Sequence, residues 1–170
     1  MTDSKQRATT SGLPPAEDCK ESGAPQPINP LTGQYADYWV LPAEERAKGF
    51  VRPVRRSYKH VGAPGPKYDL HDLTDEEKQR YANTPVPYVK FEKYPESESP
   101  VTGRYWTQKQ LDEAGKGCGV VTTMSMAIAE TYARQPDYYG STFCVGCRAH
   151  FRVGEDGEFV WDGDGSKVGT

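Results

Sequence analysis

Apolar and polar residues alternate with a helical period most clearly over residues 122–134. The pattern predicts a helix from Thr122 or Thr123 to Arg134. Pro136 ends it, because proline cannot continue a helix. An apolar stripe of this width is typical of a helix that packs one face against a core. The face that we expect to be buried consists of Met124, Ala127, Ile128, Thr131, Tyr132 and Gln135.

Three shorter helices are indicated by their start signals. Residues 42–49 begin with a proline suited to the first helical turn and end in a glycine. Residues 74–82 and 107–115 each begin with a capping box, in which a threonine is followed three residues later by Glu or Gln. The chain therefore has several short helices rather than a helical bundle.

Strand patterns are concentrated near the end of the chain. Residues 151–153 and 158–161 alternate apolar and polar positions about a Gly-rich loop, which predicts a β-hairpin. Residues 88–91 also favour a strand. Together with the short helices, these strands predict a small α+β fold.

The first 34 residues differ from the rest of the chain. They contain five prolines and no aromatic residue, so they lack the apolar area that would offset the entropy of ordering them. We expect residues 1–34 to form an extended or disordered arm, which a partner subunit could hold in place. Residues 35–170 are expected to form a single small domain.

The composition predicts a small, aromatic core. Leu, Ile, Val and Phe together number 26 of 170 residues, but the chain has 11 Tyr, 5 Phe and 3 Trp, and its net charge is only −3. No apolar run approaches the roughly 18 residues of a membrane span, and no signal-peptide pattern begins the chain, so we expect a soluble, cytoplasmic protein. The aromatic residues expected in the core are Tyr35, Trp39, Tyr105, Trp106, Tyr132, Phe143 and Phe159.

The motif with the clearest chemistry is Cys144-Val145-Gly146-Cys147. Two cysteines separated by a tight turn can direct both sulfurs at one metal ion, and a following hairpin is typical of zinc knuckles and ribbons. We expect Gly146 to allow the turn through a positive φ. A structural zinc would supply stability that so few aliphatic residues cannot. The sequence therefore predicts a zinc-knuckle hairpin with Zn²⁺ as a structural cofactor.

A closed zinc site needs two further ligands. Cys118 lies between two glycines, in a second turn that could present its sulfur. His150 follows Cys147 by three residues and is the preferred fourth ligand, with His60 as the alternative. Cys19 is left out, because the arm has no means of holding it in place.

Two other interpretations of the cysteines remain open besides metal-free thiols. A Cys-x-x-Cys redox centre usually begins a helix, whereas the residues after Cys147 favour a strand. A thiol enzyme would use Cys118, placed before the N-terminus of the 122–134 helix, with His60 as its base. Because four protein ligands leave no position for substrate, we expect a binding protein rather than an enzyme.

A basic segment suggests where such a protein could bind. Residues 46–60 contain no acidic residue and interleave two aromatic residues with positive charge. This segment and the arm could contact a macromolecular assembly, either an acidic protein or a nucleic acid. We expect a subunit or accessory factor, with nucleic-acid binding as one alternative. The expected contact residues are Arg46, Lys48, Arg52, Arg55, Arg56 and Lys59.

Overall fold

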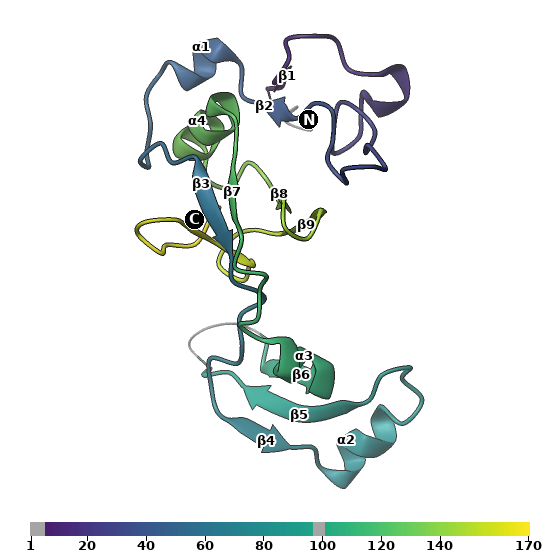
Figure 1. Ribbon diagram of the computed structural model, residues 1–170. Coiled ribbons are helices and arrows are strands. Elements are labelled where there is room, and N and C mark those ends of the chain that lie inside the picture. The colour runs from purple at the N-terminus through teal and green to yellow at the C-terminus, as the bar shows by residue number, and fades with distance from the viewer. Residues whose placement is uncertain (1–5, 97–100) are drawn as a thin grey trace. The chain divides into compact units, whose positions relative to one another are not determined.

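The computed structural model describes residues 6–96 and 101–170, and these divide into two compact units. One unit, called the terminal unit here, contains the chain up to Val61 and again from Gly117 to the end. The other, the inserted unit, is Gly62–Lys116. Both contain short helices and antiparallel strands (Figure 1), so the described chain is mixed α+β, as the sequence predicted.

A three-stranded antiparallel sheet lies at the centre of the terminal unit. Its strand order is β10 (Phe159–Trp161), β3 (Ser57–His60) and β7 (Val121–Thr123). β3 is therefore the central strand, and Figure 1 shows it running beside β7. The segments that supply these strands lie far apart in the sequence, so the sheet ties the end of the chain to its first third.

Helix α4 (Met126–Arg134) begins later than the predicted start at Thr122 or Thr123. The β-branched residues before it form β7 instead, because they pair with β3. The Ser125 side chain then caps the helix by accepting the Ile128 N–H. α4 packs with the sheet around one aromatic-rich core, whose buried members are Tyr58, Met124, Ala129, Tyr132, Cys144, Val153, Phe159, Trp161 and Val168.

The predicted hairpin between residues 151–153 and 158–161 is wrong in its pairing. Both segments contain strands, but β9 (Ala149–Arg152) pairs with β8 (Ser141–Cys144), and β10 pairs with β3. The rings of Phe159 and Trp161 in β10 meet the Tyr58 ring of β3 edge to face. This long-range aromatic packing selects β3 as the partner of β10, and local alternation cannot reveal it.

The proline-rich N-terminal residues pack against the rest of the terminal unit. β1 (Ala8–Thr9) pairs with β2 (Trp39–Val40), and a short 3-10 helix at Glu17–Cys19 buries Cys19. Helix α1 (Ala43–Arg46) follows β2. The buried Asp37 carboxylate accepts the Ser11 N–H at 3.0 Å and the hydroxyl protons of Thr10 and Ser11. Within residues 6–34, therefore, the chain's own contacts hold the segment.

Replacing Asp37 with asparagine is expected to loosen this N-terminal segment and to lower the free energy of unfolding by about 1–3 kcal/mol. Burial alone would raise the pKa of Asp37, but hydrogen bonds from Ser11 and Thr10 outweigh it and lower the pKa below its usual value. An acid whose pKa falls on folding stabilises the fold above its unfolded pKa, and this stabilisation is lost as the pH falls through the folded value.

Urea unfolding of wild type and Asp37→Asn at pH 7 and near pH 3 measures both effects. The difference between the two proteins should shrink at the lower pH. The exposed Asp18→Asn is the matched control and should change little at either pH. An Asp37→Asn protein as stable as wild type at pH 7 would show that the carboxylate does not anchor the segment.

The inserted unit is an antiparallel sheet in the order β4 (Leu70–Asp72), β5 (Tyr88–Lys93) and β6 (Gly103–Thr107), with two helices. Helices α2 (Asp75–Arg80) and α3 (Gln108–Glu113) both begin with the predicted capping boxes. The buried carboxylate of Glu92 accepts the backbone N–H groups of Lys67 and Tyr68 and the indole N–H of Trp106. The three donors satisfy a charge that would otherwise be costly to bury.

The aromatic core is confirmed for Trp106, Tyr132, Phe143 and Phe159, which are buried, whereas Tyr35, Trp39 and Tyr105 are half-buried. Trp106 belongs to the inserted unit and the other three buried residues to the terminal unit. Among the described segments, no helix combines the length and the apolar character that crossing a membrane requires.

Candidate metal centre

The Cys-x-x-Cys motif forms the turn between β8 and β9. Cys144 is the last residue of β8, and Arg148 closes the turn by donating its N–H to the Cys144 carbonyl at 2.8 Å. The positive φ expected at Gly146 is found at Arg148 instead, with φ 55°. Gly146 is needed for close packing: a Cβ there would lie 2.8 Å from Val120 Cγ2 and 3.1 Å from Cys118 Sγ. A side chain at Gly146 would therefore displace Cys118, the third cysteine of the expected ligand set.

β3 and the chain leading into β7 bring in the other two candidate ligands. His60 is the last residue of β3, and Cys118 precedes β7. Backbone hydrogen bonds continue beyond the strands: His60 donates to the Val120 carbonyl at 3.3 Å, and Gly119 donates to the His60 carbonyl at 3.0 Å. This short ladder fixes the His60 and Cys118 backbones beside each other.

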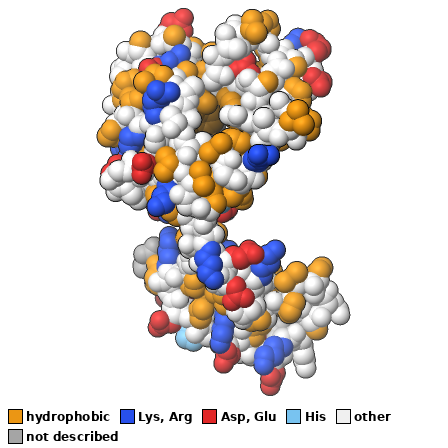
Figure 2. All heavy atoms as spheres, in the orientation of Figure 1, with side chains coloured by type: hydrophobic (Ala, Val, Ile, Leu, Met, Phe, Trp, Pro, Cys, Tyr) orange, Lys and Arg blue, Asp and Glu red, His pale blue; other side chains and the backbone are white. Residues whose placement is uncertain are grey.

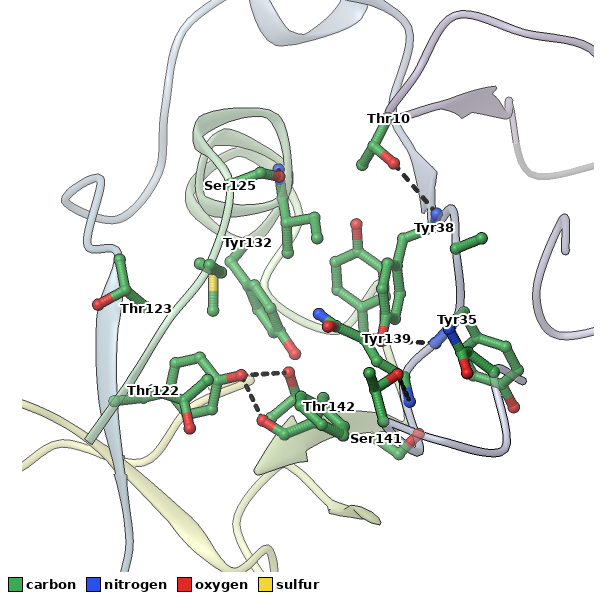
Figure 3. Close-up of a pocket in the computed structure, with 18 residues that line it drawn as sticks. Thr10, Tyr35, Tyr38, Thr122, Thr123, Ser125, Tyr132, Tyr139, Ser141 and Thr142 are labelled. Carbon is green, nitrogen blue, oxygen red and sulfur yellow. Dashed lines mark hydrogen bonds between the residues drawn. The ribbon is translucent and has the colours of Figure 1, made fainter. Parts of the chain in front are cut away.

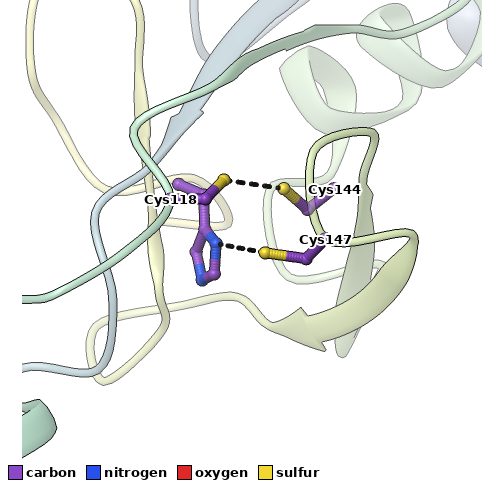
Figure 4. Close-up of side chains that lie close together, drawn as sticks. Cys118, Cys144 and Cys147 are labelled. Carbon is purple, nitrogen blue, oxygen red and sulfur yellow. Dashed lines mark hydrogen bonds between the residues drawn. The ribbon is translucent and has the colours of Figure 1, made fainter.

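The four side chains converge on one point (Figure 4). Their ligand atoms all lie within 4.8 Å of one another. The sulfurs of Cys118 and Cys144 are 3.4 Å apart, and Cys147 Sγ lies 3.5 Å from His60 Nδ1. Tetrahedral zinc with bonds of about 2.3 Å needs sulfurs roughly 3.7 Å apart, so only a small adjustment separates this arrangement from coordination geometry.

His60 is oriented by groups on the side away from the cysteines. Its Nε2 lies 3.0 Å from the Glu158 carboxylate, which can only accept a hydrogen bond, so Nε2 carries the proton and the Nδ1 lone pair faces Cys147. The Phe151 ring stacks on the imidazole at 4.5 Å, and the Phe159 ring lies at 5.0 Å. A carboxylate that orients a ligating histidine is typical of metal sites, and no local motif identified Glu158 in the sequence.

The structure reverses the expected order of the two histidines. His150, the preferred fourth ligand, lies outside the cluster, with Nε2 3.1 Å from the Tyr38 hydroxyl and its ring 4.8 Å from the Tyr35 ring. In the β8–β9 ladder Cys144 pairs with Ala149 and Phe143 pairs with His150. Because successive side chains on a strand point to opposite faces, His150 lies on the face away from Cys144. His60, the alternative, occupies the position beside the three cysteines.

The clustered thiols do not ionise alike. Cys118 and Cys147 are exposed residues, but their sulfurs are partly desolvated by their neighbours. Desolvation opposes ionisation of Cys118, but the Val120 N–H and the neighbouring Cys144 and His60 side chains outweigh it and lower the pKa of Cys118 to about 7. Desolvation, followed by the sulfurs of Cys118 and Cys144, raises the pKa of Cys147 to about 12. Crowded thiolates repel one another, so the first ionisation suppresses the next. A cation at the centre of the cluster would remove that repulsion.

The geometry gives less support to the other two hypotheses for the cysteines, a Cys-x-x-Cys redox centre and a thiol enzyme that uses Cys118. Cys147 leads into β9, so the Cys-x-x-Cys pair does not begin a helix as redox centres usually do. Cys118 is exposed, but β7 separates it from α4, so no helix N-terminus lies next to it in sequence to stabilise a thiolate. Its sulfur instead faces Cys144.

The expected basic contact residues carry less free charge than the sequence indicates. Arg46, Lys48 and Arg55 form ion pairs with Glu130, Glu45 and Asp164. Arg52 and Arg56 donate to backbone carbonyls, and Lys59 is exposed on β3. On the face shown in Figure 2, positive side chains lie among acidic ones rather than in one patch.

Comparisons with models of protein families, with curated proteins and with solved structures find no match to this chain. The functional argument therefore rests on the site itself.

Proposed function

We propose that this is a zinc-stabilised binding protein, in which His60, Cys118, Cys144 and Cys147 hold one structural Zn²⁺. The observation that supports the proposal is the convergence of three thiols and one imidazole within 4.8 Å. Three sulfur ligands and one nitrogen ligand are a common set for tetrahedral structural zinc. Mg²⁺ and Ca²⁺ prefer oxygen ligands, so this donor set disfavours them.

A structural role follows from the number of ligands. Four protein ligands complete a tetrahedron and leave no open position for water or substrate, which a catalytic zinc requires. The site therefore favours binding over catalysis. The β8–β9 turn would serve as a zinc knuckle, as the sequence suggested, with the other two ligands supplied by β3 and the segment before β7.

The proposed zinc would connect three segments that are far apart in the sequence. His60 lies just before the inserted unit, Cys118 just after it, and the Cys144–Cys147 turn comes later in the chain. The buried Cys144 also belongs to the aromatic core, at 0% exposure. A metal bound here would stabilise the terminal unit by joining its core to His60 and Cys118, which both belong to that unit.

Elemental analysis of the purified chain tests this proposal directly. About one zinc atom per chain is expected, and none should remain after Cys118, Cys144 and Cys147 are all replaced by serine. The matched control is Cys19→Ser, since Cys19 is a free thiol that lies outside the cluster. Stoichiometric iron would reassign the metal, whereas a folded, metal-free chain with alkylatable thiols would contradict the proposal.

Replacing Glu158 with alanine is expected to weaken zinc affinity by about 10-fold or more, because His60 loses the carboxylate that orients it. Competition with a zinc-chelating dye measures the change. Glu155→Ala is the matched control, because Glu155 is exposed on the neighbouring loop. Equal affinities for both variants would show that Glu158 has no role in positioning His60.

A further inference from the structure

The terminal unit contains a cavity that the metal centre does not use (Figure 3). Its volume is about 400 Å³, which lies within the usual range of small-molecule pockets. Segment 29–38 forms one wall, and residues from β3, β7, α4 and β8 form the others. None of the four candidate metal ligands lines it.

The lining is aromatic and uncharged. Tyr35, Tyr38, Tyr58, Tyr132 and Tyr139 all contribute to it, together with Thr and Ser hydroxyls and two amide side chains. Among the described residues that line the cavity, none is Asp, Glu, Lys, Arg or His. Such a lining can stack on a flat ring and form hydrogen bonds, but it offers no counter-ion to a charged ligand.

Three of the buried tyrosine hydroxyls are occupied by protein groups. Tyr58 donates to the Phe143 carbonyl, Tyr139 donates to the Trp39 carbonyl at 2.6 Å, and the Tyr38 hydroxyl lies 3.1 Å from a nitrogen of His150. These contacts hold the rings in place and leave their aromatic faces as walls.

Tyr132 likewise contributes a ring rather than a free donor. Its side chain is 3% exposed, and its hydroxyl oxygen has almost no accessible surface. Figure 3 shows the ring extending from α4 with the oxygen toward Thr142. A hydrogen bond with Thr142 lowers the pKa of Tyr132, but burial outweighs it and raises the pKa above its usual value, so the hydroxyl is protonated at neutral pH. A ligand in the cavity would therefore meet the Tyr132 ring and not its oxygen.

We propose that this cavity binds an uncharged, planar aromatic small molecule that stacks on its tyrosine rings and bonds to its Thr, Ser and amide side chains. This inference rests on the proposed binding function and names the class of ligand that the protein would bind. The residues that line the cavity are separate from the proposed zinc ligands. Nicotinamide, benzamide and adenosine have the required chemistry: each is neutral and planar at its ring and carries an acceptor.

The test is a titration of the zinc-loaded, full-length protein with these three probes, followed by protein NMR. At least one probe should bind saturably in the millimolar range or tighter, with shifts at residues that line the cavity. Nicotinate and benzoate match nicotinamide and benzamide in shape but carry a charge, and they should bind at least about 10-fold more weakly. Zinc content is measured on the same samples, so failure of the metal proposal is distinguished from failure of this one.

One variant tests whether the probe occupies this cavity. Ala36→Trp, at an exposed lining position, should abolish probe binding without affecting zinc.

Any of three results would overturn the proposal. One is the absence of saturable binding for all three neutral probes, as expected if water alone fills the cavity. Another is equal binding of the charged analogues. The third is probe affinity that Ala36→Trp does not change.

Discussion

Replacing Cys144 with serine is expected to cost on the order of several kcal/mol of stability and to unfold much of the terminal unit. Cys144 is fully buried and belongs both to the cluster of candidate metal ligands and to the aromatic core. Because a metal site forms only in the folded chain, the free energy of metal binding becomes free energy of folding. Denaturant unfolding followed by circular dichroism measures the loss.

Unfolding in the presence of a chelator distinguishes the contribution of the bound metal to stability from the contribution of Cys144 packing in the core. In excess chelator, the difference in free energy of unfolding between wild type and Cys144→Ser should become much smaller, since neither protein then holds zinc. Cys19→Ser is again the control, because it replaces a buried thiol away from the cluster. A difference between wild type and Cys144→Ser that chelator leaves intact would assign the effect to core packing alone.

The second large effect is expected for Phe159→Ala, which should lower the free energy of unfolding by about 3–5 kcal/mol. Phe159 is fully buried, its ring meets Tyr58 at 5.3 Å, and it also lies 5.0 Å from the His60 ring. The substitution leaves a cavity and removes one of the two rings that hold His60 in position. Zinc affinity should therefore fall together with stability.

Phe50→Ala is the matched control for this prediction. Phe50 is 47% exposed, so its removal should cost well under 1 kcal/mol and leave zinc affinity unchanged. Urea unfolding and zinc competition on both variants give the comparison. If Phe159→Ala lowered stability but not zinc affinity, the ring would support the core without positioning His60.

The helices that the sequence predicted well are those with local signals. The capping boxes of α2 and α3 join residues three apart, so the chain need not be folded to reveal them. The start of α4 was missed because Val121–Thr123 pairs with β3, which lies far away in sequence. The partner of β10 was missed for the same reason. Pairing between distant strands depends on the packed core, which a local pattern does not contain.

The candidate site also combines features that local sequence signals predict with features that only the folded structure reveals. The spacing of Cys144 and Cys147, and the turn around Cys118, brought three thiols into the expected set before any fold was known. The choice between His150 and His60 depended on which residue of β9 lies opposite Cys144. That register is a three-dimensional property, and a shift of one residue exchanges the two faces of the strand. Nearness in sequence therefore favoured His150, whereas the structure places His60 beside the three cysteines.

The connection between β3 and β7 contains the whole inserted unit. The two strands are antiparallel neighbours, and a hydrogen bond between the His60 carbonyl and the Gly119 N–H lies beyond their ends. Strands so placed are ordinarily joined by a hairpin loop of about two to five residues. Here Gly62–Lys116 occupies the position of that loop. The inserted unit therefore leaves and rejoins the terminal unit at one hairpin tip, and the cysteines and the aromatic core are encoded entirely outside it, whereas Trp106 and Glu92 lie within it.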